Sequence, residues 1–157
     1  MYIRMFFNLV LLFSVCTVSA NTAVFDKAAF YNAMAADDLE VVNTQLNLVR
    51  SASAAEKEAY EGALLMKKAG MVGKPKEKLS LFKAGRLKLE AAIKKGGNAE
   101  FNFLRLIIQE HAPKAVDYRG DIDKDVAAIR SNYKTLPQVV QQAISDYSKK
   151  SRVLKLI

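Results

Sequence analysis

The sequence has very few residues for thiol, imidazole or indole chemistry: it contains no tryptophan, one cysteine and one histidine. The cysteine, Cys16, lies in an N-terminal segment that we expect to be removed, which would leave no residue for a disulfide, a reactive thiol or a cysteine metal site. The histidine, His111, cannot build most zinc sites or hydrolytic triads from this chain alone. We therefore expect no metal and no cofactor.

Recognisable catalytic motifs are also missing. The sequence has no G-x-S-x-G, no H-E-x-x-H, no phosphate-binding loop and no dinucleotide fingerprint. The stretch DIDKD, with Asp121, Asp123 and Asp125, imitates the start of a calcium loop. Val126 stands where that loop needs glycine, and Asn132 stands where it needs an acid. We therefore expect Asp121 to cap a helix and Asp123 to lie in its first turn.

Residues 1–20 have the pattern of a signal peptide. Arg4 supplies a short positive region, residues 5–18 are almost wholly apolar, and Val18-Ser19-Ala20 form a small-residue cleavage site. The apolar run is shorter than the roughly 20 residues that span a bilayer. We expect cleavage, and with it export to the periplasm or beyond and no membrane span in residues 21–157; a retained anchor is the alternative.

After this segment the sequence predicts helices throughout. No alternating strand pattern and no Asn-Gly or Asp-Gly hairpin turn is present, and apolar residues recur at spacings of three and four. The predicted helices cover residues 25–35, 37 or 38 to 50, 54–69, 75–95 and 98–112, with a sixth from Asp121 and a seventh from Pro137. Asp37 or Asp38 is the predicted N-cap of the second helix, Asn98 caps the fifth, and Pro75 suits the first turn of the fourth. Gly85 lies inside the fourth, where it costs about 1 kcal/mol against alanine; close approach of a neighbouring helix is one use for it.

Short connections favour antiparallel neighbours. We therefore expect an all-α fold of six to seven antiparallel helices, arranged as a compact bundle or as stacked helical hairpins. Residues 21–157 form a single domain in this prediction, and residues 150–157 form a loosely packed tail.

The stretch FNFLRLIIQEHAP, residues 101–113, places Glu110 beside His111 and so raises the question of an acid–base pair. At about 100° per residue, these two side chains point in different directions around the helix. His111 also falls in the last turn, where the helix dipole favours a positive imidazole. A structural histidine is thus the expectation, and a small enzyme using His111, Arg105 and a nearby carboxylate is the alternative.

The same helix carries a narrow polar stripe formed by Asn102, Arg105 and Gln109. We expect this stripe to be solvated or structural. In the alternative, Arg105 is half-buried and pairs with a carboxylate such as Asp125. If the protein has an anionic ligand, Arg105 is the first candidate to hold it, because its planar guanidinium suits carboxylate and phosphate groups.

Positive charge is concentrated in one segment. Residues 67–95 contain 10 Lys and Arg against 2 Asp and Glu, whereas residues 21–157 together contain 23 against 16, a net charge of +7. Such a segment suits anionic headgroups, cell-wall polymers or a protein partner; the alternative is a solvated lysine face. Nucleic acid is not expected, because no interleaved aromatic platform is present. The candidate binding residues in this segment are Lys76, Lys78, Lys83, Arg86 and Lys88.

Two resemblances bear on this prediction. AYEGALLMKK and LEAAIKK are similar to parts of tetratricopeptide helices, but their Ala-Leu and Ala-Ile pairs lie 29 residues apart instead of the roughly 34 of that repeat. A helical-repeat scaffold is therefore an alternative fold. FKAGRLKLEAAI and EFNFLRLIIQEHAPKAVDYRGDID resemble small secreted α-helical proteins of Bacteroidetes-type bacteria, which implies an exported helical protein but no activity and no site residue.

Taken together, the sequence predicts an exported, non-enzymatic helical protein. Its expected role is to bind a protein partner or an anionic envelope component through residues 67–95. The sequence gives no oligomeric state and no ligand identity.

Overall fold

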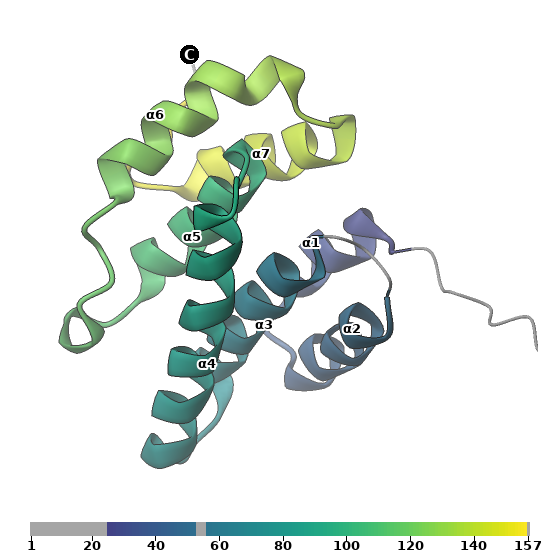
Figure 1. Ribbon diagram of the computed structural model, residues 1–157, viewed down its shortest axis with the longest axis vertical. Helices are drawn as coiled ribbons and strands as arrows, with labels where there is room; N and C mark the ends of the chain where they lie inside the picture. Colours follow the sequence, from purple (N-terminus) through teal and green to yellow (C-terminus); the bar gives the residue numbers. More distant parts are fainter. Residues whose placement is uncertain (1–24, 53–55, 157) are drawn as a thin grey trace, which may run out of the picture.

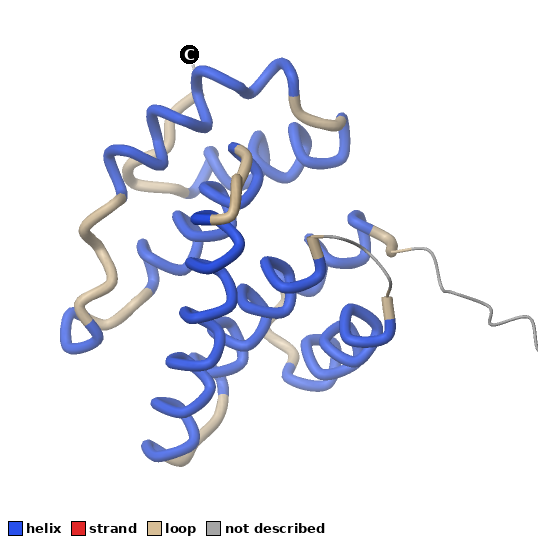
Figure 2. Tube along the Cα trace, viewed as in Figure 1, coloured by secondary structure: helices blue, strands red, loops and turns tan. Residues whose placement is uncertain are grey.

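The computed structural model describes residues 25–52 and 56–156, and this part of the chain is helical, with no strand (Figures 1 and 2). The prediction of an all-α fold is therefore confirmed; the predicted signal peptide lies outside the described residues. The α-helices are α1 (Lys27–Ala35), α2 (Leu39–Ser51), α3 (Lys57–Met71), α4 (Pro75–Lys94), α5 (Ala99–His111), α6 (Ile122–Asn132) and α7 (Gln138–Lys150), with short 3-10 turns η1 (Lys114–Val116) and η2 (Tyr133–Thr135).

Side-chain caps and prolines explain where several helices begin. The Asp38 carboxylate accepts hydrogen bonds from the backbone N–H groups at the start of α2, and the Asn98 amide oxygen accepts one from Phe101 N at the start of α5. Pro75 occupies the first turn of α4, where its missing N–H costs nothing. Both N-caps and this proline were predicted from the sequence.

Helices α3 and α4 form an antiparallel hairpin joined by a short turn at residues 72–74. They cross at two glycines. A Cβ atom built on Gly85 would lie 2.5 Å from the Gly62 carbonyl oxygen, and one built on Gly62 would lie 2.7 Å from the Gly85 carbonyl oxygen. The predicted use of Gly85, close approach of a neighbouring helix, is thus confirmed.

The hydrophobic core is built mainly from α1, α2, α3, α5, α6 and α7, and several aromatic side chains lie in it. Phe30, Tyr60 and Phe103 are almost completely buried, and the Phe30 and Tyr60 rings meet edge to face with centroids 4.8 Å apart. Helix α4 contributes little to this core, because only Gly85 and Leu89 are buried on it. Figure 1 shows the N-terminal end of α4 extending away from α6 and α7.

The C-terminal segment is packed, which corrects the prediction of a loose tail. Leu154 is fully buried and belongs to the core. Ser151 is also buried, and its hydroxyl accepts hydrogen bonds from the backbone N–H groups of Val153 and Leu154. The sequence pattern alone did not predict this burial, because a single leucine after a helix has no periodicity.

None of the helices that the structure describes has both the length and the apolarity needed to cross a membrane.

Candidate functional site

The exposed face of α4 carries basic and apolar side chains in one row. Lys76, Leu79, Lys83 and Leu87 follow one another at spacings of three and four residues, which places them along one side of the helix. Both lysines are exposed. Leu79 is 49% exposed and Leu87 is 73% exposed, so two large apolar side chains of the row face solvent. We call these four residues the α4 row.

Among the described residues, no carboxylate lies within ion-pair distance of Lys76, Lys78 or Lys83. Lys74, just before the helix, also has no carboxylate of a described residue within ion-pair distance. The only acid among residues 74–83 is Glu77, which is exposed. Their positive charges are therefore not neutralised within the fold. Three of the predicted binding residues thus remain available to an external anion.

The other two basic candidates on α4 make contacts inside the protein. Lys88 Nζ lies 3.0 Å from Glu61 Oε2 on α3, and Arg50 Nε lies 2.8 Å from Glu61 Oε1. The guanidinium of Arg86 lies 4.9 Å from the centre of the Tyr118 ring, in a cation–π arrangement. Lys88 therefore helps to hold α4 against α3, and Arg86 lies against the loop between α5 and α6.

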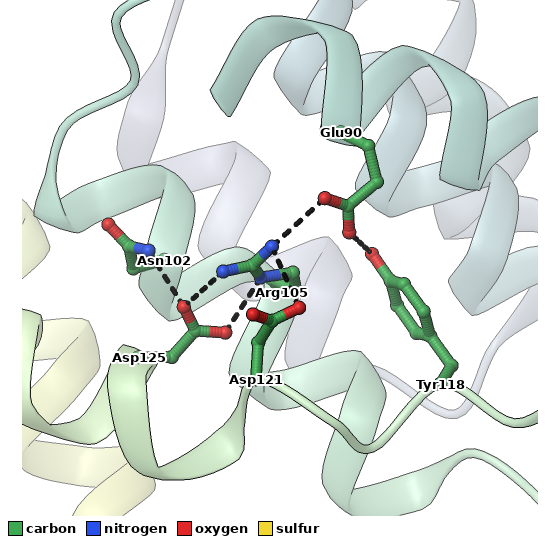
Figure 3. A network of polar contacts seen from close by, with 6 residues as sticks. All are labelled: Glu90, Asn102, Arg105, Tyr118, Asp121 and Asp125. Atoms are coloured by element: carbon green, nitrogen blue, oxygen red, sulfur yellow. Dashed lines mark hydrogen bonds and ion pairs between the residues drawn. The ribbon is translucent and has the colours of Figure 1, made fainter. Parts of the chain in front are cut away.

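Arg105 is surrounded by carboxylates from two elements (Figure 3). Its Nε and Nη2 donate to Asp125 Oδ2 and Oδ1 at 2.8 and 2.6 Å, a bidentate pair. Its Nη1 donates to Glu90 Oε2 at 2.9 Å and lies 3.3 Å from Asp121 Oδ2. Asn102 Nδ2 completes the cluster with a 2.7 Å hydrogen bond to Asp125 Oδ1.

This network corrects the expectation that Arg105 is solvated, because Arg105 is only 3% exposed. The alternative, a pair with Asp125, is confirmed. Burial alone would lower the pKa of Arg105, but hydrogen bonds to Asp125 raise it well above its ordinary value. All three guanidinium nitrogens already contact carboxylates, so Arg105 links α5 to α4 and α6. It is therefore not positioned to hold an anionic ligand.

Asp121 has a different role from the one that the sequence indicated, whereas Asp125 has the partner that the alternative gave it. Asp121 stands at the N-cap position of α6, but its side chain makes no capping hydrogen bond and is directed to Arg105. Asp125 is fully buried against the same guanidinium. Within the described ranges, no group of three or more His, Cys, Asp or Glu residues has the geometry of a metal site.

His111 and Glu110 face different partners, as their positions around the helix predicted. The ring nitrogen Nδ1 of the exposed His111 lies 2.8 Å from the Ile107 carbonyl oxygen. Glu110 instead accepts hydrogen bonds from Tyr147 Oη at 2.8 Å, Ser151 Oγ at 2.5 Å and Arg152 N at 2.9 Å. Within its described part, the structure brings neither Arg105 nor an acid into hydrogen-bond contact with this histidine.

The sequence reading missed a buried acid, Glu100. Its Oε1 accepts hydrogen bonds from Tyr31 Oη and Tyr60 Oη, both at 2.9 Å, and its Oε2 accepts one from Lys27 Nζ at 2.8 Å. Burial, followed by the charge of Glu100, raises the pKa of Tyr60 far above its ordinary value. The position of Glu100 within the apolar arc of α5 was the feature of the sequence that could have predicted its burial.

The third residue of the polar stripe, Gln109, is also buried. It is 1% exposed, and neither its Nε2 nor its Oε1 has a hydrogen-bond partner among the described residues. Gln109 lines a cavity of about 270 Å³ between α4 and the loop that precedes α6. A larger cavity of about 470 Å³ is lined by the start of α5, the end of α6 and residues 135–137. In three comparisons, no family model, curated protein or solved structure matched this chain.

Proposed function

We propose that this protein binds an anionic phospholipid surface of the cell envelope through α4 and carries out no catalysis. The observation that carries this proposal is the α4 row, in which Lys76 and Lys83 alternate with the exposed Leu79 and Leu87. Binding at a membrane surface combines burial of apolar side chains with attraction between cations and anionic headgroups. The row offers both on one face of a helix.

The charge on this half of α4 supports a lipid surface as the occupant. Each lysine near an anionic membrane contributes about 1 kcal/mol. Lys74, Lys76, Lys78 and Lys83 have no ion-pair partner among the described residues, so no internal salt bridge must break before they reach the headgroups. Leu79 and Leu87 are both exposed, and their insertion among the headgroups would supply the apolar contribution that reversible membrane binding also needs.

Vesicle sedimentation tests this proposal. The protein is expected to sediment with vesicles of phosphatidylglycerol and phosphatidylcholine, and to remain in solution with phosphatidylcholine alone. Because exposed charges are screened within about 10 Å at 0.1 M salt, and within about 3 Å at 1 M, binding is expected to weaken steeply as salt increases. Equal sedimentation with both kinds of vesicle would contradict the proposal.

An acidic protein partner is the competing outcome. A partner that recognises this face would also be released by salt, so salt alone does not separate the two. Purified vesicles contain no protein, and binding to them therefore discriminates between a lipid surface and a protein. The proposal includes export to the periplasm or the cell exterior, which rests on the signal-like residues 1–20.

A further inference from the structure

We propose that the cavity formed by the start of α5, the end of α6 and residues 135–137 is a binding site for a neutral sugar. Its volume of about 470 Å³ falls within the roughly 300–1,000 Å³ of small-molecule sites. The polar side chains that line it are those of Asn98, Asn102, Asn132 and Thr135, and the apolar ones include Leu136 and Pro137. This site is separate from the α4 row and does not depend on membrane binding.

Asn98 and Asn132 each use one end of the side-chain amide to hold the fold. Asn98 Oδ1 accepts a hydrogen bond from Phe101 N at 3.1 Å, and Asn132 Nδ2 donates to the Ala128 carbonyl oxygen at 2.9 Å. These partners identify the amide atoms, because a backbone N–H needs an acceptor and a carbonyl oxygen needs a donor. The other end of each amide, Asn98 Nδ2 and Asn132 Oδ1, has no hydrogen-bond partner among the described residues, and both residues are exposed.

The third asparagine, Asn102, is held most firmly. Its Nδ2 donates to Asp125 Oδ1, and Asp125 is itself fixed by the bidentate pair with Arg105. Figure 3 shows the Asn102 oxygen directed away from Asp125. That oxygen has no partner in the described part of the chain, yet the only unpartnered buried side-chain atoms there are those of Gln109. The half-buried Asn102 therefore presents an acceptor that solvent can reach, and the residue lines the cavity.

The unused atoms select the class of ligand. Asn98 Nδ2 can donate, whereas Asn102 Oδ1 and Asn132 Oδ1 can accept, as can the Thr135 hydroxyl, which already donates to the Asn132 carbonyl oxygen. No charged side chain of the described residues lines the cavity, and a charged ligand would lose water there without gaining an ion pair. Hydroxyl groups both donate and accept. Neighbouring hydroxyls on a sugar ring therefore match this set of amides, and the C–H groups of the ring can contact Pro137.

Nuclear magnetic resonance of the purified full chain tests this site with defined probes. Glucose, galactose, mannose and N-acetylglucosamine are the sugars, and cyclohexanol is a ring of similar size with a single hydroxyl. At least one sugar is expected to shift the side-chain amide signals of Asn98, Asn102 and Asn132 saturably, with no such shift from cyclohexanol. The proposal is refuted if no sugar shifts these signals, which would mean that water alone meets the amides, or if cyclohexanol acts equally.

Two variants separate binding from a structural role. Asn98→Asp keeps the oxygen that caps α5 but removes the free donor, and it is expected to weaken binding of the sugar at least several-fold. Asn132→Ala removes an acceptor at the exposed last residue of α6, where alanine is favourable for a helix, and it is also expected to weaken binding. Asn47→Asp, on the exposed face of α2, is the matched control and is expected to bind as the wild type does. Unchanged binding by both cavity variants would overturn the assignment.

A methyl glycoside of the sugar that binds distinguishes two sources of the ligand. Its methyl group stands where the next unit of a polysaccharide would be attached. Retained affinity would assign the site to a sugar unit within an envelope polymer, and lost affinity would assign it to a free monosaccharide. Both results support a sugar site, because each requires that the free sugar binds.

Discussion

Gly62 and Gly85 face each other where α3 crosses α4, and the space between them excludes even one methyl group. A Cβ atom on Gly85 would lie 2.5 Å from the Gly62 carbonyl oxygen and 2.7 Å from Met66 Cγ. This crossing holds α4 on the body of the protein while its N-terminal half stays exposed. The orientation of the α4 row therefore depends on two residues without side chains.

Substitution of Gly85 by alanine is expected to destabilise the protein. Alanine gains about 1 kcal/mol of helix propensity, but its methyl group would collide with backbone that cannot move without separating the helices. Overpacking of this kind costs about 1–3 kcal/mol, so we expect a net loss in the free energy of unfolding measured in urea.

The matched control is Gly70→Ala, in the last turn of α3, where nothing lies within 4 Å of an added Cβ. Without a collision, only the propensity term remains, and this variant is expected to be as stable as the wild type or more stable by up to about 1 kcal/mol. If Gly85→Ala stabilised the protein as Gly70→Ala does, the close crossing would be wrong.

The buried pair of Arg105 and Asp125 predicts a non-additive double mutant. Arg105→Met leaves a fully buried carboxylate without its cation, and loss of one partner of a buried pair typically costs about 3–5 kcal/mol. Adding Asp125→Leu removes that uncompensated charge. We expect the double variant to be more stable in urea than Arg105→Met alone, and a double variant that is less stable would contradict the interpretation of this network.

Glu110 predicts a loss of stability in acid. Burial alone would raise the pKa of Glu110, but hydrogen bonds from Ser151, Arg152 and Tyr147 hold it below its ordinary value of 4.5. A carboxyl whose pKa is lower in the folded state stabilises the fold above its unfolded pKa, and this contribution disappears as the pH falls through the folded value.

We therefore expect the wild type to lose more unfolding free energy than Glu110→Gln does when the pH falls below 4.5. Urea unfolding of both proteins at a series of pH values measures this difference, and the other acids cancel because both proteins contain them. Parallel stability curves for the two proteins over this range would show that Glu110 contributes nothing to the acid sensitivity.

The exposed leucines predict a contribution to membrane binding that salt does not remove. Replacing Leu79 and Leu87 with serine deletes apolar surface that is already exposed, so the fold is expected to keep its stability. Transfer of apolar surface from water is favourable at about 25 cal/mol per Å². In vesicle sedimentation, the double variant is expected to bind more weakly than the wild type at low and at moderate salt. If this variant bound vesicles with wild-type affinity, the two leucines would contribute nothing, and the lysines alone would account for binding.

Local signals in the sequence predicted most helix boundaries, because caps and prolines act within one turn. Asp38, Asn98 and Pro75 mark helix starts in the structure as they do in the sequence. The buried tail was missed because Leu154 is held by contacts with distant elements and by the Ser151 hydroxyl. Periodicity carries no information on such contacts.

The candidate site was predictable only in part. Charge counting located the basic segment, but it could not show that Lys88 pairs with Glu61 across the α3–α4 crossing while Lys76 and Lys83 remain exposed. In the same way, the polar stripe of α5 was visible, yet its burial depends on α4 and α6 packing over it. Both outcomes are set by packing angles between helices, which helical periodicity does not encode.

The most direct test of the central claim compares two triple variants with the same net charge. One carries Lys76→Gln, Lys78→Gln and Lys83→Gln on α4; the other carries Lys124→Gln, Lys134→Gln and Lys150→Gln on α6, η2 and α7. All six lysines are exposed and lack an ion-pair partner among the described residues. At about 1 kcal/mol per lysine, the α4 variant is expected to bind anionic vesicles about 100-fold more weakly than the wild type, and the control variant only a few-fold more weakly. Equal affinities for the two variants would contradict the assignment of membrane binding to α4.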